Sequence, residues 1–167
     1  KIPYLGLCYG MQLAVIEYAR NVAKLKGAHT TEVNPNSPHP VIGVMDEQKD
    51  KLAQGHYGGS MRLGAWPAVL KAKTLASEAY GEQIISERHR HRYEVNPKYI
   101  GKLSLAGMIF SGTSPDSRLC EIAELPTKMH PFFLGTQFHP ELRARPLTPH
   151  PLFTEFLRAA VARKRKK

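Results

Sequence analysis

Residues 6–12 read GLCYGMQ and place a cysteine between two glycines, where two differently patterned segments meet. Residues 2–7, which begin with the apolar run IPYL, fit a short buried strand, and residues 11–22 fit an amphipathic helix. A tight strand-to-helix turn needs small residues around its apex, and Gly6 and Gly10 meet that need around Cys8. The helix N-terminus directs its positive end at the thiol, which predicts a lowered pKa for Cys8. The alternative is a buried structural cysteine.

Further elements follow along the chain. Pro35, Pro38 and Pro40 predict irregular structure, and Asn96-Pro97 predicts the start of a short helix. A last amphipathic helix is expected over 151–161. Extended segments are expected over 41–45, 60–66, 84–95, 105–111, 119–125 and 132–138. Strands mixed with helices predict one α/β domain with a mixed sheet.

The 167-residue chain has no apolar stretch long enough for a membrane span, and its two cysteines favour a reducing compartment such as the cytoplasm. Its net charge of +10 raises the possibility of nucleic-acid binding. Residues 163–167 carry five of the positive charges, and such a tail is usually a solvated end.

The second basic cluster is RHRHR (88–92). Strand alternation predicts that its arginines lie on one face and His89 and His91 on the other. No aromatic platform accompanies the run, which disfavours a nucleic-acid groove. No cysteine or acidic partner stands at a familiar ligand spacing, so no metal site is expected.

The strand expected over 132–138 ends in His139-Pro140-Glu141. Pro140 favours an extended conformation at His139, so that His139 and Glu141 project to the same side. A carboxylate beside an imidazole holds its tautomer, and the imidazole can take the proton of a thiol. In α/β proteins such groups gather at the carboxyl ends of strands. The pattern therefore predicts a Cys8 nucleophile, a His139 base and a Glu141 that orients it.

Five stretches carry a family resemblance: GLCYGMQLAVIEYARNV (6–22), SPHPVI (37–42), GGSMRLG (58–64), ERHRHRYEVNP (87–97) and QFHPEL (137–142). They resemble the class I (triad) glutamine amidotransferases and, among these, the glutaminase domain of CTP synthases. The resemblance implies a flavodoxin-like three-layer α/β fold with a mixed, mostly parallel central sheet. It also implies that the first strands of the domain lie upstream, so that residues 1–162 form an amidotransferase domain without its N-terminal part and 163–167 a basic tail.

The resemblance assigns roles to particular residues. Cys8, His139 and Glu141 would form the triad, and the backbone N–H of Tyr9 would stabilise the oxyanion. The family usually has leucine at the position of Tyr9, and a glycine-rich loop upstream supplies its second oxyanion donor. Contacts with the glutamine substrate are implied for Tyr9, Gly10, Met11, Gln12, Glu32 and Arg92, with Glu32 meeting the substrate ammonium group.

The implied reaction is hydrolysis of L-glutamine through a glutamyl thioester. An amidoligase domain of the same enzyme would use the ammonia, with ATP and Mg2+, to convert UTP into CTP. The resemblance further implies no cofactor in this domain, no nucleic-acid or membrane partner, and a homotetramer only for the full-length enzyme. The alternatives are another class I amidotransferase, a γ-glutamyl hydrolase, an inactive interaction domain or a basic nucleic-acid-binding module.

Overall fold

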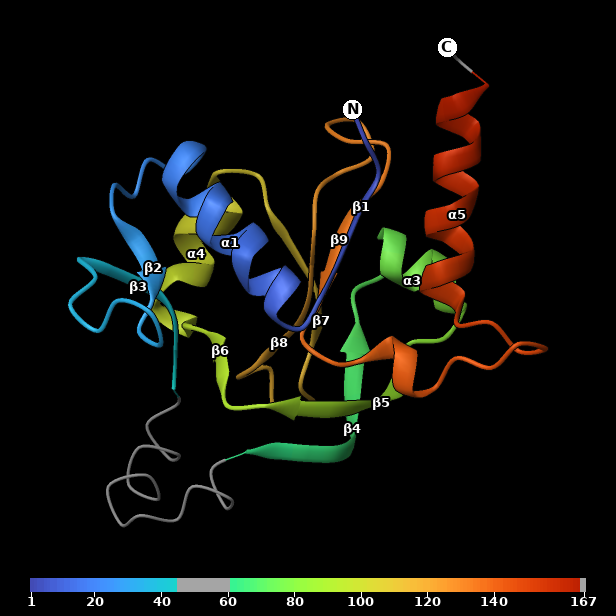
Figure 1. Cartoon of the computed structure of the whole chain (residues 1–167), viewed down its shortest axis with the longest axis horizontal. Coiled ribbons are helices and arrows are strands. Elements are labelled where there is room, and N and C mark those ends of the chain that lie inside the picture. The colour runs from blue at the N-terminus through green and yellow to red at the C-terminus, as the bar shows by residue number, and fades with distance from the viewer. Residues whose placement is uncertain (45–60, 166–167) are drawn as a thin grey trace.

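The computed structural model describes residues 1–44 and 61–165 (Figure 1). The strands are β1 (Tyr4–Leu7), β2 (Ala28–Thr30), β3 (His39–Val44), β4 (Arg62–Leu70), β5 (Ile84–His91), β6 (Tyr93–Val95), β7 (Ile109–Thr113), β8 (Cys120–Glu124) and β9 (Phe133–Thr136). The helices are α1 (Tyr9–Asn21), α3 (Leu75–Tyr80), α4 (Pro97–Leu105), α5 (Pro151–Lys164) and the short 3-10 helix η2 (Pro140–Leu142).

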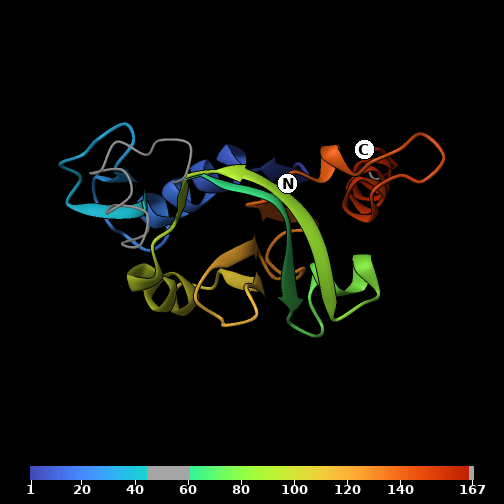
Figure 2. The same ribbon diagram turned by 90° about the horizontal axis from the view of Figure 1, so that it is seen from below.

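Six strands form the central sheet in the order β1-β9-β8-β7-β4-β5, and β2-β3-β6 form a smaller one. The α/β class and the mixed sheet are thus confirmed. The central sheet is not mostly parallel over the described residues, because β1 and β9 make its one parallel pair there. β7, β8 and β9 follow one another as antiparallel neighbours, and β4 and β5 form a long curved hairpin (Figure 2).

Two hydrophobic cores cover the two faces of the central sheet. The neighbours Ile122 and Ala123 of β8 belong to opposite cores, as strand alternation requires. Helices α1 and α4 pack in the core that contains Ala123, and α3 and α5 pack in the core that contains Ile122 (Figure 1). The three-layer arrangement is therefore confirmed.

Several boundaries differ from the sequence-based expectations. The strand expected over 105–111 starts only at Ile109, because α4 continues to Leu105 and Gly107, at φ +107°, turns the chain. Pro40, expected in irregular structure, lies in β3 where the pairing with β2 shifts register. The extended segment over 84–95 divides at Arg92 between the two sheets.

Other differences concern helices and the ends of the described ranges. Helix α3 was not expected, although Thr74 caps it and Gly81 ends it in a left-handed conformation. Helix α5 runs to Lys164, so the first two residues of the expected basic tail are helical. Met45 and the first three residues of the GGSMRLG stretch lie outside the described residues.

A close approach between α1 and β9 gives a stability test. A Cβ added at Gly135 would lie 2.7 Å from Cγ and 3.0 Å from Cα of Met11, so Gly135→Ala forces helix and strand apart. We expect a loss of about 1–3 kcal/mol in the free energy of unfolding, measured by urea denaturation. The control is Gly101→Ala in α4, where a Cβ meets nothing within 4 Å. That change is expected to stabilise by about 0.5–1 kcal/mol, and equal effects at the two glycines would contradict the packing described.

Candidate active site

Cys8 occupies a strained turn between β1 and α1. Its backbone has φ 49° and ψ −102°, a conformation that residues other than glycine rarely adopt. The Cys8 N–H donates to the Thr136 carbonyl at 2.7 Å, and the Cys8 carbonyl accepts from the Gln12 N–H at 3.2 Å. Such a conformation costs on the order of 1–3 kcal/mol and persists only where the surroundings enforce it. Strain of this kind marks Cys8 as a functional candidate.

The two glycines of the turn have different roles. A Cβ at Gly6 would lie 2.8 Å from the backbone carbon of Gly10, so only glycine fits there. A Cβ at Gly10 would meet the Tyr4 hydroxyl at 3.7 Å, which is ordinary contact. Space around the turn therefore requires a glycine at position 6 and not at position 10, contrary to the expectation that both sides need one. The Tyr4 hydroxyl also donates to the Gly10 carbonyl at 2.7 Å and braces the turn.

The parallel pairing of β1 with β9 brings His139 to the same sheet edge as Cys8. Leu7 pairs with Thr136 at the carboxyl ends of both strands, and His139 follows three residues later. The His139 N–H donates to the Arg88 carbonyl of β5 at 2.8 Å, which fixes the backbone that carries the imidazole. Cys8 and His139 thus come from neighbouring strand ends, where α/β proteins gather functional groups.

His139 is paired with Glu141 as the sequence predicted. Its Nδ1 lies 2.6 Å from Oε1 of Glu141. Because a carboxylate only accepts hydrogen bonds, this contact places the ring proton on Nδ1 and leaves a lone pair on Nε2. The Nε2 atom is buried and has no hydrogen-bond partner within the described part of the chain. The imidazole is therefore held in the tautomer that can accept a proton at Nε2.

The environment of the Cys8 sulfur corrects one expectation. Burial raises the pKa of the Cys8 thiol, the nearby charges of Glu141 and Glu32 raise it further, and hydrogen bonds from the Tyr9 N–H and from Gln137 lower it. The net direction is upward, whereas the helix N-terminus predicted a lowered pKa. Desolvation of the half-buried sulfur outweighs the contact with the first N–H of α1. The thiol therefore depends on a base to become a thiolate near neutral pH.

The residues expected to contact glutamine lie in different surroundings. Met11 is fully buried against Gly135, so its side chain belongs to the core. The side chain of Gln12 is buried, and its Oε1 has no partner among the residues described. Glu32 is exposed just beyond β2, and its charge acts on the Cys8 sulfur. Arg92 is half-buried between β5 and β6.

The sequence did not reveal a buried polar cluster behind the site. Arg62 Nη1 lies 2.7 Å from Oε1 of Glu121 and 4.0 Å from Oε1 of Glu94, and all three side chains are buried. His89 and His91 face this cluster, as the predicted alternation of RHRHR requires, with 2.9 Å between Nδ1 of His89 and Nε2 of His91. Burial, reinforced by Arg62, lowers the pKa of His89 to about 2 and that of His91 to about 3. Both rings are therefore neutral.

Gln137 was also missed, although its side chain reaches the sulfur of Cys8. It is fully buried at the end of β9, and its Nε2 donates to Sγ of Cys8 at 3.7 Å. The available signal was a long polar side chain two positions before His139, in an expected strand that is mostly apolar. Over residues 1–44 and 61–165, no group of three or more His, Cys, Asp or Glu side chains could hold a metal ion.

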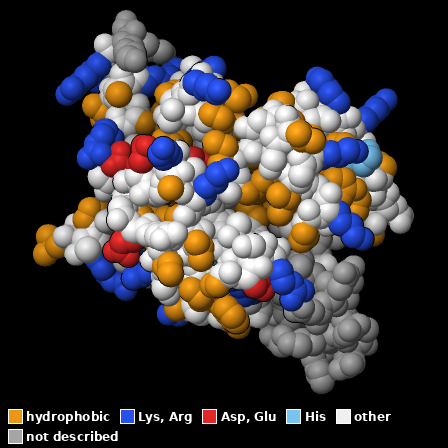
Figure 3. All heavy atoms as spheres, turned by 180° about the vertical axis from the view of Figure 1, so that it is seen from behind, with side chains coloured by type: hydrophobic (Ala, Val, Ile, Leu, Met, Phe, Trp, Pro, Cys, Tyr) orange, Lys and Arg blue, Asp and Glu red, His pale blue; other side chains and the backbone are white. Residues whose placement is uncertain are grey.

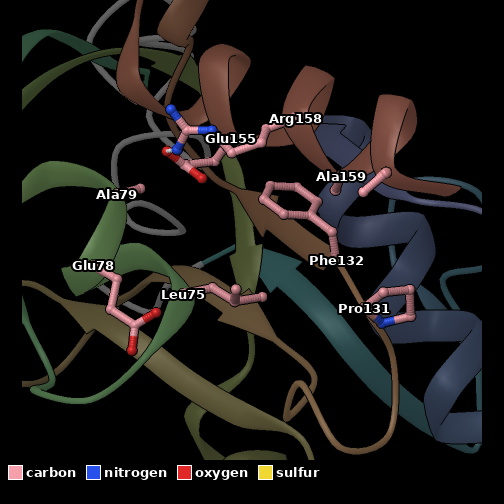
Figure 4. Close-up of a pocket in the computed structure, with 9 residues that line it drawn as sticks. Leu75, Glu78, Ala79, Pro131, Phe132, Glu155, Arg158 and Ala159 are labelled. Atoms are coloured by element: carbon pink, nitrogen blue, oxygen red, sulfur yellow. Dashed lines mark hydrogen bonds and ion pairs between the residues drawn. The ribbon is translucent and has the colours of Figure 1, made fainter. Parts of the chain in front are cut away.

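A hollow lies between α3 and α5, where Leu75 and Phe132 form apolar walls and Glu155 pairs with Arg158 (Figure 4). It contains no cysteine or histidine, so it lacks the groups for the chemistry considered above. The face seen in Figure 3 carries Lys and Arg side chains that are spread among apolar and neutral surface. None of the described helices is both long and apolar enough to cross a membrane.

Sequence comparisons with known proteins match nearly the whole chain. The family model "Glutamine amidotransferase class-I" matches residues 1–159. A CTP synthase of Caldanaerobacter subterraneus subsp. tengcongensis is 58% identical over 159 residues, which are 95% of this chain and 29% of that protein. A CTP synthase of Thermococcus gammatolerans is 54% identical over 98% of this chain and 30% of its own length. The chain thus spans less than a third of these relatives.

A solved structure of a relative has the same fold. The glutaminase domain of Trypanosoma brucei CTPS, solved with bound acivicin, superposes with a TM-score of 0.87 and 37% identity, over 96% of this chain and 60% of that one. Sequence and fold thus agree over nearly the whole chain. The chain belongs to the glutamine amidotransferase class-I family.

Proposed function

We propose that the chain hydrolyses the side-chain amide of L-glutamine to glutamate and ammonia, with Cys8 as nucleophile, His139 as general base and acid, and Glu141 as the residue that orients His139. One observation carries the proposal. A strained cysteine and a His–Glu pair joined at 2.6 Å follow the carboxyl ends of two neighbouring parallel strands. This arrangement is a nucleophile, a base and an orienting group in the order that acyl transfer requires.

The proposed steps are those of amide hydrolysis by a cysteine nucleophile. Nε2 of His139 takes the thiol proton, and the sulfur attacks the amide carbon of glutamine to give a tetrahedral oxyanion. We assign the Tyr9 N–H as a donor to this oxyanion, and its hydrogen bond to the Cys8 sulfur supports that role. The C–N bond breaks as His139 returns the proton to nitrogen, ammonia leaves, and a glutamyl thioester remains on Cys8. His139 then deprotonates a water molecule, which hydrolyses the thioester to glutamate.

The two ends of the amino acid call for opposite charges in the protein. Glu32 is the proposed partner of the substrate ammonium group, and Arg92 the proposed partner of its carboxylate. The charge of Glu32 acts on the Cys8 sulfur, which supports its place near the substrate. Gln12 and the backbone of Tyr9, Gly10 and Met11 complete the proposed glutamine contacts. No cofactor is needed for this reaction.

The relatives named CTP synthase extend the proposal to the whole protein. We propose that the ammonia passes to an amidoligase domain of the same enzyme, which aminates UTP to CTP with ATP and Mg2+. A cytoplasmic location and a homotetramer of the full-length enzyme belong to this proposal. The chain matches 29–30% of these relatives, which leaves room in them for the second activity.

The first test identifies the nucleophile and the substrate class. A diazoketone analogue of glutamine is expected to add once, on Cys8, and free glutamine should suppress the addition. Cys8→Ser should abolish it, whereas Cys120→Ser should not, because Cys120 is fully buried. Intact-mass spectrometry gives the readout. Labelling that persists in Cys8→Ser, or that glutamine does not suppress, would refute the assignment.

A second test separates two effects of Glu141. Glu141→Gln removes the carboxylate that fixes the His139 tautomer, and we expect kcat for glutamine hydrolysis to fall about 10²–10⁴-fold. The same change should lower the pKa of Cys8, because the charge of Glu141 raises it. Activity should therefore fall while the thiolate fraction at neutral pH rises, as measured by the pH dependence of alkylation with iodoacetamide.

The matched control is Glu155→Gln on α5, where the carboxylate pairs with Arg158 at the surface. Neither kcat nor the alkylation profile should change in this variant. An unchanged kcat in Glu141→Gln would show that Glu141 does not orient the base.

A further inference from the structure

Gln137 has one feature that the proposed mechanism leaves unused: its amide touches the reacting sulfur. Its Nε2 lies 3.7 Å from Sγ of Cys8, within the range of a hydrogen bond to sulfur. The residue is 0% exposed, and its backbone N–H donates to the Glu121 carbonyl at 2.8 Å. The backbone that carries the amide is therefore fixed, and the side chain is shielded from solvent.

A short chain of hydrogen bonds sets which end of this amide faces the sulfur. The Tyr93 carbonyl can only accept, so it takes the Nε2 end of Gln12 at 2.8 Å. The second N–H of the same Gln12 amide points at Oε1 of Gln137, 3.3 Å away. Gln137 therefore accepts at Oε1 and has its Nε2 left for Cys8. The Tyr93 carbonyl oxygen, which can only accept, therefore determines which end of each side-chain amide donates and which accepts.

A donor at this position favours the charged form of the nucleophile. A hydrogen bond to a thiolate is stronger than one to a thiol, so the donor stabilises the thiolate relative to the thiol. Burial, Glu141 and Glu32 all act in the opposite direction on the Cys8 pKa, and the Gln137 contact is one of the effects that lower it. Being uncharged, the amide does this without competing with Glu141 for the imidazole.

We propose that Gln137 is a catalytic residue of this site, which donates a hydrogen bond to the Cys8 sulfur, and that Gln12 and the Tyr93 carbonyl hold its donor end in place. The role in catalysis rests on the proposed glutamine hydrolysis, whereas the contact with the sulfur does not. Gln137 keeps its own protons throughout, and the thiol proton still passes to His139. Gln12 acquires a positioning role in addition to its proposed contact with glutamine.

The test is the pH dependence of Cys8 alkylation by iodoacetamide, which follows the thiolate and needs no glutamine. In Gln137→Met, which has a similar length and no donor, the apparent pKa of Cys8 should rise by about one pH unit or more. Gln12→Met leaves the Gln137 amide free to turn and should raise that pKa by less. The double variant should match Gln137→Met alone, because the two residues act through one contact.

The matched control is Ser111→Ala. It removes a buried hydrogen bond, 2.8 Å long, from the Ser111 hydroxyl to Glu124, and neither residue contacts Cys8. It should lower thermal stability without moving the alkylation pKa. If Gln137→Met does not fold, Gln137→Glu keeps the acceptor for Gln12 and replaces the donor with a carboxylate, which should raise the pKa further.

An unchanged Cys8 pKa in the folded Gln137 variants, or the same shift in Ser111→Ala, would overturn the inference. A parallel assay of glutamine hydrolysis by the unsubstituted chain keeps the two proposals apart. Hydrolysis with an unchanged alkylation pKa in the variants would reject only the role of Gln137. A shifted pKa in a chain that cannot hydrolyse glutamine would reject only the proposed reaction.

Discussion

The hydrogen bond from the Cys8 N–H to the Thr136 carbonyl, at 2.7 Å, is the contact on which the rest of the site depends. It extends the parallel pairing of β1 and β9 by one residue beyond the last paired position. A φ of 49° is unfavourable for a residue other than glycine, and this hydrogen bond ties the strained residue to the neighbouring strand. The same pairing places the segment that carries His139 next to the turn. One short ladder thus orients the proposed nucleophile and positions its proposed base.

The electrostatics of the site show why several groups must act together. Burial and the charges of Glu141 and Glu32 make the thiolate of Cys8 costly, yet both carboxylates have proposed uses, one at the imidazole and one at the substrate ammonium group. Their effect is opposed by two neutral donors, the Tyr9 N–H and the Gln137 amide. In the proposed mechanism, His139 also favours the thiolate by taking its proton. In this mechanism, the Cys8 thiol is protonated at rest and becomes a thiolate when His139 accepts its proton.

The sequence predicted the parts of the fold that local patterns determine. The strand-to-helix turn at Cys8, the His139–Glu141 pair and the capped start of α4 at Asn96 each follow from steric or hydrogen-bonding rules that span a few residues. Strand direction did not follow, because antiparallel pairing of β7, β8 and β9 depends on which distant strands meet. The family resemblance suggested a mostly parallel sheet, and the described strands contain one parallel pair in the central sheet.

The site was predictable to the same extent. Cys8, His139 and Glu141 could be identified from sequence motifs. The buried contact between Gln12 and Gln137 could not, because these residues are 125 positions apart and meet only in the folded chain. The most direct test of the account is rapid acid quenching of the chain with glutamine, followed by intact-mass spectrometry and an ammonia assay. The account predicts a glutamyl adduct confined to Cys8, with ammonia released before glutamate. Release of ammonia while Cys8 remains unmodified would contradict it.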